Sequence, residues 1–306
     1  MSPEAASPHG VHRGLVLVTI AAPALGALFA LGWSTVRVPD GFTLAIAAGM
    51  YLLSAIGIEV GFHRALAHRA FRCGGALRGV LGVLGSMAAQ GPLLYWVAVH
   101  RQHHRHADAA LDPHSPRPAG PAAFWHAHIG WMFASRPLRL AALTDLLRDP
   151  VSMAVHRTYL VWVVAGLGIP VVAGLARSGP LGALDGFIYG GLVRMFLQHH
   201  VTWSLNSFAH LWGARPNATR DASGNLWVLA LPTLGAAWHN NHHAFPSSAS
   251  NDFRWWQLDP GAWLIRAAAR LGWVWDVRAP DGRLAGAIGD PPAGLKTTAR
   301  EQAPIE

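Results

Sequence analysis

Histidine is the residue type in this sequence with the clearest capacity for chemistry, because nine of the 18 histidines fall into four short groups. The groups lie in HRALAH at residues 63–68, HRQHH at 100–104, NSFAH at 206–210 and HNNHH at 239–243. Their members are His63, His68, His100, His103, His104, His210, His239, His242 and His243. A neutral imidazole is a proton acceptor and a ligand for iron, copper, zinc or nickel. The pattern therefore predicts metal binding.

The number of histidines predicts two metal ions rather than one. Nine imidazoles are too many for a single tetrahedral zinc ion, whereas two ions with four or five nitrogens each account for all of them. We expect iron, because redox-inert zinc rarely needs two shells so rich in nitrogen. The HExxH pattern of zinc proteases does not occur in the sequence, which argues against a membrane metalloprotease.

The spacing within each group limits how the side chains are positioned. In the two HxxHH groups, positions i, i+3 and i+4 share one helix face and can aim three imidazoles at one place. Asn206 and His210, at i and i+4, also share a face. His63 and His68 are five residues apart, which is roughly 140° around an ideal α-helix. They are expected to converge only if the helix ends or unwinds between them.

The composition predicts that membrane helices carry these groups. Of the 306 residues, 52% are hydrophobic and only 13% are charged, whereas soluble domains carry about 25% charge. Four apolar runs are long enough to cross a bilayer, at residues 14–36, 42–62, 157–176 and 180–205. The short turns between them predict two helical hairpins in an all-α integral membrane protein. The run at 226–238 is too short to span and is expected to form a buried or interfacial helix.

The distribution of cationic residues predicts which side of the membrane holds the histidines. Residues 63–157 carry eleven arginines and the chain beyond residue 205 carries nine lysines or arginines, whereas the two hairpin turns carry one arginine each. The positive-inside rule then places both termini and all four histidine groups in the cytoplasm. The bacterial plasma membrane is the expected location. Residues 1–282 are expected to form a single domain, with a helical cytosolic cap from 63–156 and 206–282, followed by a disordered tail at 283–306.

The apolar run at residues 74–95 is ambiguous on hydropathy alone. If it crossed the bilayer, His68 and His100 would lie on opposite sides of the membrane and could not share a metal centre. The run is therefore expected to lie in the interface or inside the cap.

The four histidine groups, in this order, resemble those of the acyl-CoA (stearoyl-CoA, delta-9 type) desaturases of the membrane fatty acid desaturase superfamily. The similarity runs from about residue 42 to 277, includes FHRALAH, VHRQHHRHADAALDPHSP, TWSLNSFAHLWG and HNNHHAFP, and is nearest to the short bacterial form without a cytochrome b5 domain. The resemblance implies four spans with a cytosolic cap, a diiron centre held by all nine histidines, and Asn206 holding a water beside one iron. Oxygen activated at the irons would remove two adjacent hydrogens from a long-chain acyl substrate, leaving a cis double bond and water.

Two positions depart from this family's pattern. Ala236 stands where the family has a glutamate before the last histidine group, so a carboxylate that orients a histidine is expected to be missing. Ala98 stands where animal members have a basic residue near the phosphates of CoA. The acyl carrier is therefore open among CoA, which the resemblance favours, acyl carrier protein and a lipid.

The resemblance also implies a bent, narrow tunnel for the acyl chain, whose bend sets which carbons face the metals. Thr202 and Trp203, just before Asn206, are expected to line it near the bend. Ala47 and Tyr51 lie three to four turns before His63, and their bulk is expected to set the accepted chain length. The alternative for Tyr51 is a lipid-facing or helix-packing role.

Desaturation needs two electrons per turnover, and the sequence contains no flavin, nicotinamide or heme-binding motif. A separate acidic donor, such as ferredoxin, rubredoxin or cytochrome b5 with its reductase, is expected to dock on the basic face of a chain with net charge +8. The arginines are scattered and form no nucleic-acid-binding motif, so a nucleic acid partner is not expected.

Two other functions remain open on the sequence. A diiron hydroxylase or related oxygenase of the same superfamily, acting on a lipid, can share all nine histidines. A metal-binding membrane transporter is less favoured, because it would need polar groups inside the spans and most of the histidines fall just outside them.

Overall fold

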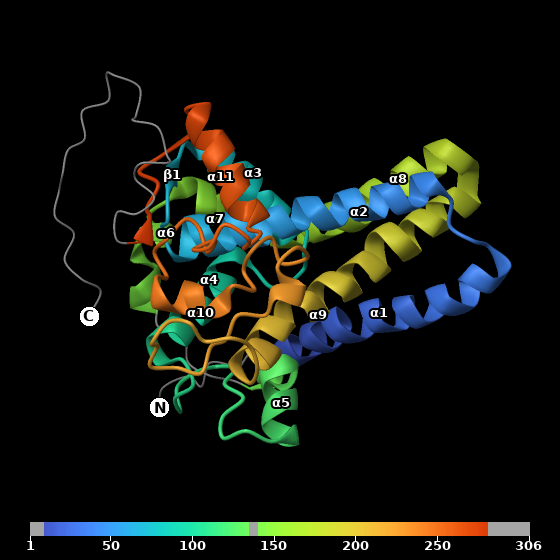
Figure 1. Ribbon diagram of the computed structural model, residues 1–306. Helices are drawn as coiled ribbons and strands as arrows, with labels where there is room; N and C mark the ends of the chain where they lie inside the picture. Colours follow the sequence, from blue (N-terminus) through green and yellow to red (C-terminus); the bar gives the residue numbers. More distant parts are fainter. Residues whose placement is uncertain (1–8, 135–139, 281–306) are drawn as a thin grey trace, which may run out of the picture.

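The computed structural model describes residues 9–134 and 140–280, and within them the chain is mostly helical (Figure 1). Long helices project to one side of the molecule, and shorter helices gather at their other end in a cap. The tail expected at residues 283–306 lies outside the described residues.

Three helical stretches in the described ranges are long and apolar enough to cross a membrane, Arg13–Val36, Gly41–Ala67 and Tyr159–His210. The first belongs to α1 (His9–Val36), and the second joins α2 (Gly41–Ile56) to a π-helix, η1 (Gly57–Ala67). The third joins α8 (Tyr159–Asp185), a second π-helix η4 (Gly186–Val193), α9 (Arg194–Ser207) and a 3₁₀ turn η5 (Phe208–His210). The first two stretches cover the apolar runs at residues 14–36 and 42–62.

The third stretch folds back on itself instead of running straight. Its 52 residues would extend about 78 Å, more than twice the thickness of a bilayer core. The helix is kinked at Ser178 and Gly179, where Gly179 has a φ of +66°, a conformation that favours glycine. Gly174 and Gly182 then pack so closely that neither has room for a β-carbon. The runs expected as separate spans at 157–176 and 180–205 thus lie in a single helical stretch that reverses direction at residues 178–179. The described residues therefore contain three candidate spans, whereas the sequence predicts four.

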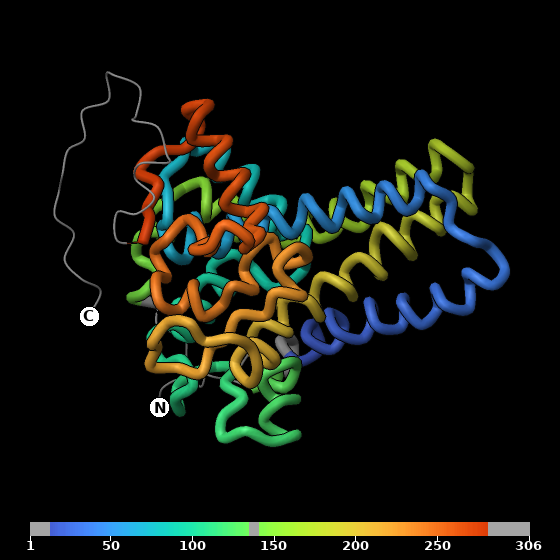
Figure 2. The backbone as a smooth tube through the Cα atoms, viewed as in Figure 1, coloured from blue at the N-terminus to red at the C-terminus, as the bar shows by residue number. Residues whose placement is uncertain are grey.

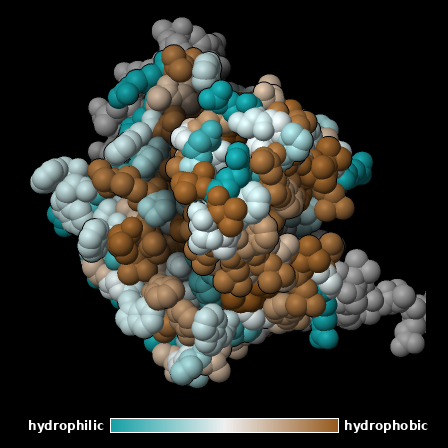
Figure 3. All heavy atoms as spheres, turned by 90° about the vertical axis from the view of Figure 1, so that its right-hand side faces the viewer, coloured by the Kyte–Doolittle hydropathy of each residue, from teal (hydrophilic) through white to brown (hydrophobic). Residues whose placement is uncertain are grey.

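Apolar side chains cover the outside of the long helices. Leu31, Val164 and Val172 are 69%, 66% and 65% exposed, and Figure 3, viewed from the projecting ends of the helices, shows hydrophobic residues over much of this face. A soluble protein rarely exposes so large an apolar patch. These helices are suited to the hydrocarbon core of a bilayer, and the chain is a membrane protein.

The cap is built from two separate parts of the chain. The part between the second and third long stretches forms α3 (Gly75–Ser86), α4 (Leu93–His106), α5 (Pro121–His128), η2 (Gly130–Phe133), η3 (Leu140–Leu143), α6 (Thr144–Leu147) and α7 (Pro150–Arg157). The part after α9 forms η6 (Trp227–Leu229), α10 (His239–Ala244) and α11 (Pro260–Arg270). Strands β1 (Arg72–Cys73) and β2 (Val274–Trp275) pair antiparallel and join the two parts, and Figure 2 shows the later part of the chain lying against the earlier one.

Two predictions for segments of the cap have different outcomes. The ambiguous run at residues 74–95 contains α3, whose twelve residues are too few to span and which packs against η1 and α7 in the cap. The prediction of a helix at residues 226–238 is wrong, because that segment forms one short 3₁₀ helix followed by turns. Pro232 lies in these turns, and Leu234 and Gly235 have positive φ values of 51° and 97° that end any helix.

Two hydrophobic clusters hold the elements that carry the histidines. Phe62 of η1 packs with Leu93 and Val97 of α4, and these three side chains are at most 1% exposed. On the other side of η1, Ile265 of α11 and Val274 of β2 form a second buried cluster. The end of η1 is therefore held between α4 and the late part of the chain.

Candidate metal centre

The structure brings all nine histidines of the four sequence groups together in two clusters. The five-histidine cluster contains His63, His68, His100, His104 and His242, and the four-histidine cluster contains His103, His210, His239 and His243. In each cluster, one ring nitrogen from every member lies within 4.8 Å of the others. The end of η1, the end of α4, η5 and α10 meet at this place.

The rings of the five-histidine cluster turn their Nε2 atoms toward one another. The Nε2 atoms of His68 and His100 are 2.7 Å apart. The Nε2 atom of His242 lies 3.0 Å from that of His63 and 2.9 Å from that of His104. Two ligands at right angles, each about 2.1 Å from an ion, would be separated by about 3.0 Å. The spacing of these donors fits a first-row metal ion.

The four-histidine cluster has the same arrangement. The Nε2 atoms of His210 and His239 are 3.1 Å apart, and those of His103 and His243 are 3.3 Å apart. Neutral imidazoles can share only one proton between each such pair, so nine converging nitrogens are better satisfied by metal ions than by one another. The donor set therefore fits a metal ion in each cluster.

The π-helix η1 explains how His63 and His68 converge. The backbone N–H of His68 donates to the carbonyl oxygen of His63 at 3.0 Å, a bond that spans five residues as in a π-helix. Residues five apart then share a face, and the two rings lie 4.8 Å apart. η1 ends at Ala67, so the helix does end between the two histidines, and its turns are wider than those of an α-helix.

Each HxxHH group contributes to both clusters. On α4, His100 and His104 belong to the five-histidine cluster, whereas His103 belongs to the other. On α10 the outer two histidines join the four-histidine cluster, and His242 joins the five-histidine cluster. The expectation that three imidazoles aim at one place is therefore wrong. Around a helix, positions i and i+4 are about 40° apart, whereas i+3 lies about 60° to the other side of i.

Four of the nine histidines have a carboxylate at Nδ1, on the side of the ring away from the cluster. The pairs are His63 with Glu59 at 2.7 Å, His103 with Asp112 at 3.0 Å, His210 with Asp108 at 3.0 Å and His243 with Asp221 at 2.9 Å. The side chains of these carboxylates are at most 11% exposed. Such a partner fixes the ring orientation, keeps the proton on Nδ1 and leaves Nε2 as the ligand atom.

Sequence reasoning missed these four carboxylates as partners of the histidines. A signal was present for two of them, since Glu59 lies one helical turn before His63 and Asp112 follows His103 by nine residues, whereas Asp108 lies 102 residues from its partner His210. Asp221 carries no such signal, because it lies 22 residues from His243 in a segment without helix or strand.

His239 has no carboxylate of this kind. Its Nδ1 is buried and makes no hydrogen bond of standard geometry in the described part of the chain. Burial and the neighbouring His210 lower the pKa of His239 well below its usual value, and the backbone carbonyl of Ala236 only partly offsets this. Ala236 is itself buried, so the alanine that departs from the family pattern lies three residues from the one histidine of its cluster without a carboxylate.

Burial keeps most of these imidazoles neutral, which is the form that binds metals. It lowers the pKa well below the usual 6.5 for six of them, and the neighbouring imidazoles lower it further. These six are His68, His100, His104, His239, His242 and His243. For His103 burial acts in the same direction, but the Asp112 carboxylate outweighs it and the pKa is raised.

Two of the residues expected along the acyl chain make specific contacts. The hydroxyl of Tyr51 donates to the carbonyl oxygen of Pro232 at 2.8 Å, which links α2 to the late part of the cap. The Oγ1 of Thr202 accepts a bond from the side-chain amide of Gln90 at 3.0 Å. Sequence reasoning missed Gln90, because it lies in a run that looks merely apolar.

The other expected residues lie in different surroundings. Trp203 is buried and packs with Val16 of α1 and Met132 of η2. Ala47 packs on a cluster between α1 and η4, on the inner side of the long helices. Asn206 is half-buried near the end of α9, and His210 lies beyond that end in η5, so the two do not share one continuous α-helix.

The sequence pattern of one protein family covers most of the chain. The pattern described as fatty acid desaturase matches residues 39–278, a range that includes both histidine clusters. The chain belongs to the fatty acid desaturase family. This desaturase is therefore an oxidoreductase of lipid metabolism. The family is typically iron-dependent, and the two clusters are groups that could hold such a metal.

Similar proteins use three kinds of acyl carrier according to their names. The desaturase is 42% identical over 252 residues to hex-5-enoyl-[acyl-carrier protein] acetylenase of Moorena producens, covering 79% of this chain and 78% of the relative. It is 37% identical to sn-2 palmitoyl-lipid 9-desaturase of Nostoc, covering 72% and 76%. It is 34% identical to acyl-CoA C20 delta5-desaturase of Anemone leveillei, covering 75% and 71%.

Proposed function

We propose that this desaturase binds one iron ion in each histidine cluster and converts a long-chain fatty acyl substrate into a cis monounsaturated product, with delta-9 as the position of the double bond. The observation that carries this proposal is the pair of adjacent clusters, whose nine imidazoles come from four separate segments and include members of both clusters on α4 and on α10. Each turnover takes two hydrogens from adjacent carbons and uses one dioxygen, two electrons and two protons, so that two waters form. The irons, when bound, supply the activation of dioxygen.

The residues of the chain hold the site in a form ready for metal. The Nε2 atoms point inward, and Glu59, Asp108, Asp112 and Asp221 accept the Nδ1 protons of four rings. These bonds keep the rings from turning when ligands or substrate exchange. Asn206 is proposed to hold a water beside one ion, as the corresponding residue does in the family that the sequence resembles.

The acyl chain is proposed to lie along the inner side of α2 and α9. The bond between Gln90 and Thr202 connects the segment before α4 to α9 at a half-buried position, where a bend in the chain would present two carbons to the irons, and Trp203 would flank that bend. Tyr51 and Ala47 are farther from the clusters along α2, and the bond from Tyr51 to Pro232 closes this end. Chain length would then be set at Tyr51 and Ala47.

CoA is proposed as the acyl carrier, and acyl carrier protein and lipid are the competing carriers. Ala98, where a basic residue would be expected near CoA phosphates, is 4% exposed on α4, so this position supplies neither charge nor access. Offering purified desaturase the same acyl chain on CoA, on acyl carrier protein and in a lipid decides among them by the rate of product formation. The highest rate with a carrier other than CoA would overturn this part of the proposal.

The kinked third helical stretch is proposed to cross the membrane twice, which gives four crossings. Both ends of the chain and the cap would then face the cytoplasm of a bacterial cell, where the electron donor and the acyl carrier are found. The eleven arginines of residues 63–157 support this orientation by the positive-inside rule.

Expression in a host without its own desaturase tests the reaction. Lipids are analysed by gas chromatography–mass spectrometry after derivatisation of double bonds. New monoenes from the unchanged chain, absent with His242→Ala and present with His106→Ala, support the proposal, because His242 lies in a cluster and His106, on the same helix as three ligands, does not. Hydroxy acids in place of monoenes would favour a diiron hydroxylase instead, and turnover by His242→Ala would refute the ligand assignment.

A further inference from the structure

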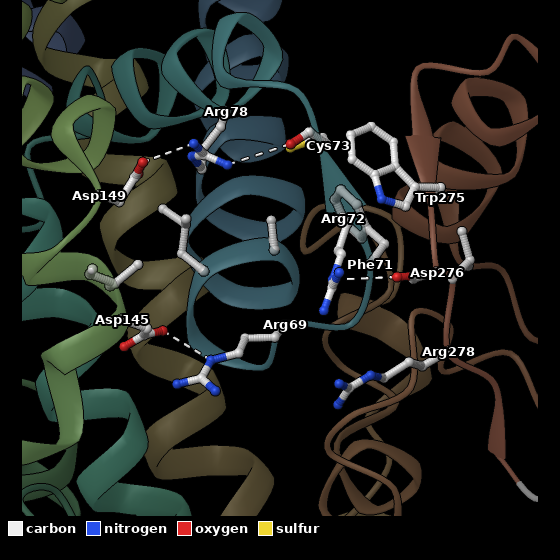
Figure 4. A pocket seen from close by; sticks show the side chains of 14 residues that line it. Arg69, Phe71, Arg72, Cys73, Arg78, Asp145, Asp149, Trp275, Asp276 and Arg278 are labelled. Atoms are coloured by element: carbon white, nitrogen blue, oxygen red, sulfur yellow. Dashed lines mark hydrogen bonds and ion pairs between the residues drawn. The ribbon is translucent and has the colours of Figure 1, made fainter. Parts of the chain in front are cut away.

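A cavity of about 840 Å³ opens between the two parts of the cap, away from the long helices (Figure 4). Its walls come from the end of η1, from the β1–β2 ribbon, and from α3, α6 and the start of α7. In Figure 1 the elements around it, β1, α6 and α7, lie on the opposite side of the cap from the projecting helices. The cavity therefore does not face the bilayer.

The lining of this cavity has a small excess of positive charge, with four arginines against three aspartates. Arg78 pairs with Asp149 at 2.8 Å, and Arg72 pairs with Asp276 at 3.3 Å. The side chain of Arg278 is exposed and makes no ion pair within residues 9–134 and 140–280. Its charge is free to meet an anionic group.

The fourth arginine of the lining, Arg69, is only partly neutralised. Its partner Asp145 is also bound by two nitrogens of Arg101 at 2.8 Å each, so two guanidinium groups share one carboxylate. Figure 4 shows Arg69, Arg72 and Arg278 around the same open part of the cavity. The side chains of Arg69 and Arg72 are 47% and 62% exposed. A ligand can therefore reach three cationic groups at once.

The wall of the cavity is part of the backbone that carries the five-histidine cluster. Leu66 lies in that wall between His63 and His68, and Arg69 directly follows His68 in the chain. Arg101 directly follows His100 and donates to the carbonyl oxygen of Leu66 at 2.6 Å. His68 is thus one residue away from a group that lines the cavity, and His100 is next to an arginine that binds two lining residues, Leu66 and Asp145.

None of the residues placed along the acyl chain lines this cavity. Its lining includes neither Tyr51 nor Thr202 nor Gln90, so the cavity does not lead to the path proposed for the substrate. An acyl carrier would have to deliver its chain elsewhere. A partner that only passes electrons needs a short path to the metal and no opening to the substrate.

We propose that a small acidic electron-transfer protein of the ferredoxin type docks on this cavity, and that its electrons enter the five-histidine cluster through the backbone beside His68. This inference rests on the proposed desaturase function. Two reduced donors each give up one electron per turnover and are oxidised. Together with the two electrons from the substrate C–H bonds they reduce one dioxygen, with two added protons, to two waters. The arginine side chains steer the acidic donor and fix its orientation.

Binding of a plant-type ferredoxin to the purified desaturase in nanodiscs tests the docking site without any turnover. Arg278→Glu is the main variant, because Arg278 has no ion pair to lose, and Arg254→Glu is the matched control. Arg254 is also exposed, makes no ion pair in the described ranges and does not line the cavity. At low salt, Arg278→Glu should weaken binding about tenfold, and the difference should shrink as salt rises toward 0.5 M, where charges are screened beyond about 4 Å. The control should bind like the unchanged chain.

A second variant makes the same change in net charge without introducing a negative group. Arg72→Gln combined with Arg278→Gln removes two positive charges without adding a negative one. This variant should weaken ferredoxin binding, whereas the control should leave it unchanged. Equal binding by all variants, or equal loss with Arg254→Glu, would overturn the docking site. Failure of ferredoxin to bind the unchanged chain at low salt would also overturn it.

Turnover assays separate this inference from the proposed function. With ferredoxin, ferredoxin reductase and NADPH, Arg278→Glu should raise the KM for ferredoxin about tenfold while kcat at saturating ferredoxin stays within twofold. With dithionite as reductant, the difference between Arg278→Glu and the unchanged chain should disappear. No desaturation by the unchanged chain even with dithionite would contradict the proposed function, and the binding result would still decide the docking site.

Discussion

Removing the carboxylate of Asp108 should weaken metal binding in the four-histidine cluster alone. Asp108 accepts the Nδ1 proton of His210 at 3.0 Å and the backbone N–H of Ala222 at 2.7 Å, both through Oδ2. Its other oxygen receives the hydroxyl of Ser115 at 3.3 Å. In Asp108→Asn the amide oxygen can take the place of Oδ2 and keep the first two bonds, and only the negative charge is lost. In Asp108→Ala the bonds are lost as well.

The two substitutions therefore bracket the size of the effect. Loss of a partner behind a metal-bound histidine costs about 10-fold to 100-fold in metal affinity, which is about 1.4 to 2.7 kcal/mol. We expect Asp108→Asn near the lower value, because the ring of His210 stays oriented. We expect Asp108→Ala near the upper value, with a further loss of fold stability of about 1–3 kcal/mol for the unpaired N–H of Ala222.

Iron content and iron release measure this effect directly. The purified variants are passed through a desalting column with a chelator, and the bound iron is measured by mass spectrometry over time. The unchanged chain should hold two ions, whereas Asp108→Ala should lose one ion rapidly and retain the other. Asp252→Asn is the control, since Asp252 pairs with Arg266 at 2.7 Å and lines neither histidine cluster. Equal release of both ions from Asp108→Ala, or release at the rate of the unchanged chain, would refute the assignment of this carboxylate to one cluster.

Three further predictions concern other parts of the molecule. Tyr51→Ala should lengthen the acyl chains that are desaturated, whereas Tyr51→Phe, which keeps the ring and loses only the bond to Pro232, should not. The fatty acid profile by gas chromatography decides, and an unchanged profile for Tyr51→Ala removes the idea. Asp259→Ala should destabilise the fold by about 3–5 kcal/mol, because the fully buried Asp259 binds the buried Arg64 at 2.9 Å. Asp252→Ala removes one partner of a more exposed pair and should cost less than about 1 kcal/mol. Equal shifts in the melting temperatures of the two variants would contradict this. Burial and His200 lower the pKa of His128 to about 4. The unfolded chain binds a proton near pH 6.5 that the folded chain binds only near pH 4, so stability should fall as pH drops from 6.5 to 4. His128→Gln should make the melting temperature less sensitive to pH over this window, and an unchanged slope would count against the shift.

The candidate ligands could be chosen from the sequence because their signal is local. Three imidazoles within five residues are conspicuous in any fold, and six of the nine candidate histidines stand in such groups. All nine lie in the two clusters. The division between the clusters was not predictable from spacing alone, because it depends on how far α4 and α10 are rotated about their axes. The π-helix at η1 was not predictable from spacing either, and Phe62 within it packs against α4.

The carboxylate partners of the histidines could be predicted only where they lie close to their histidine in the sequence. Glu59 meets His63 because residues four apart share a helix face, so this pair could have been found from the sequence. Asp221 meets His243 because the segment after α9 folds back over α10, and Asn217 in that segment bonds to Asn240 and Asn241. Such long-range contacts depend on the whole cap, and no short motif records them.

The two clusters differ in the number of their histidines and in the number of carboxylates that support these histidines. The five-histidine cluster has one carboxylate partner, at His63, whereas three of the four rings in the other cluster have one. A carboxylate at Nδ1 holds the ring in place and strengthens the opposite nitrogen as a metal ligand, so the cluster with fewer nitrogens has more rings supported in this way. Ala236 removes a possible carboxylate from His239 in the cluster that already has three. The departure from the family pattern thus falls where its cost is smallest, and we infer that this desaturase keeps metal in the four-histidine cluster through Asp108, Asp112 and Asp221.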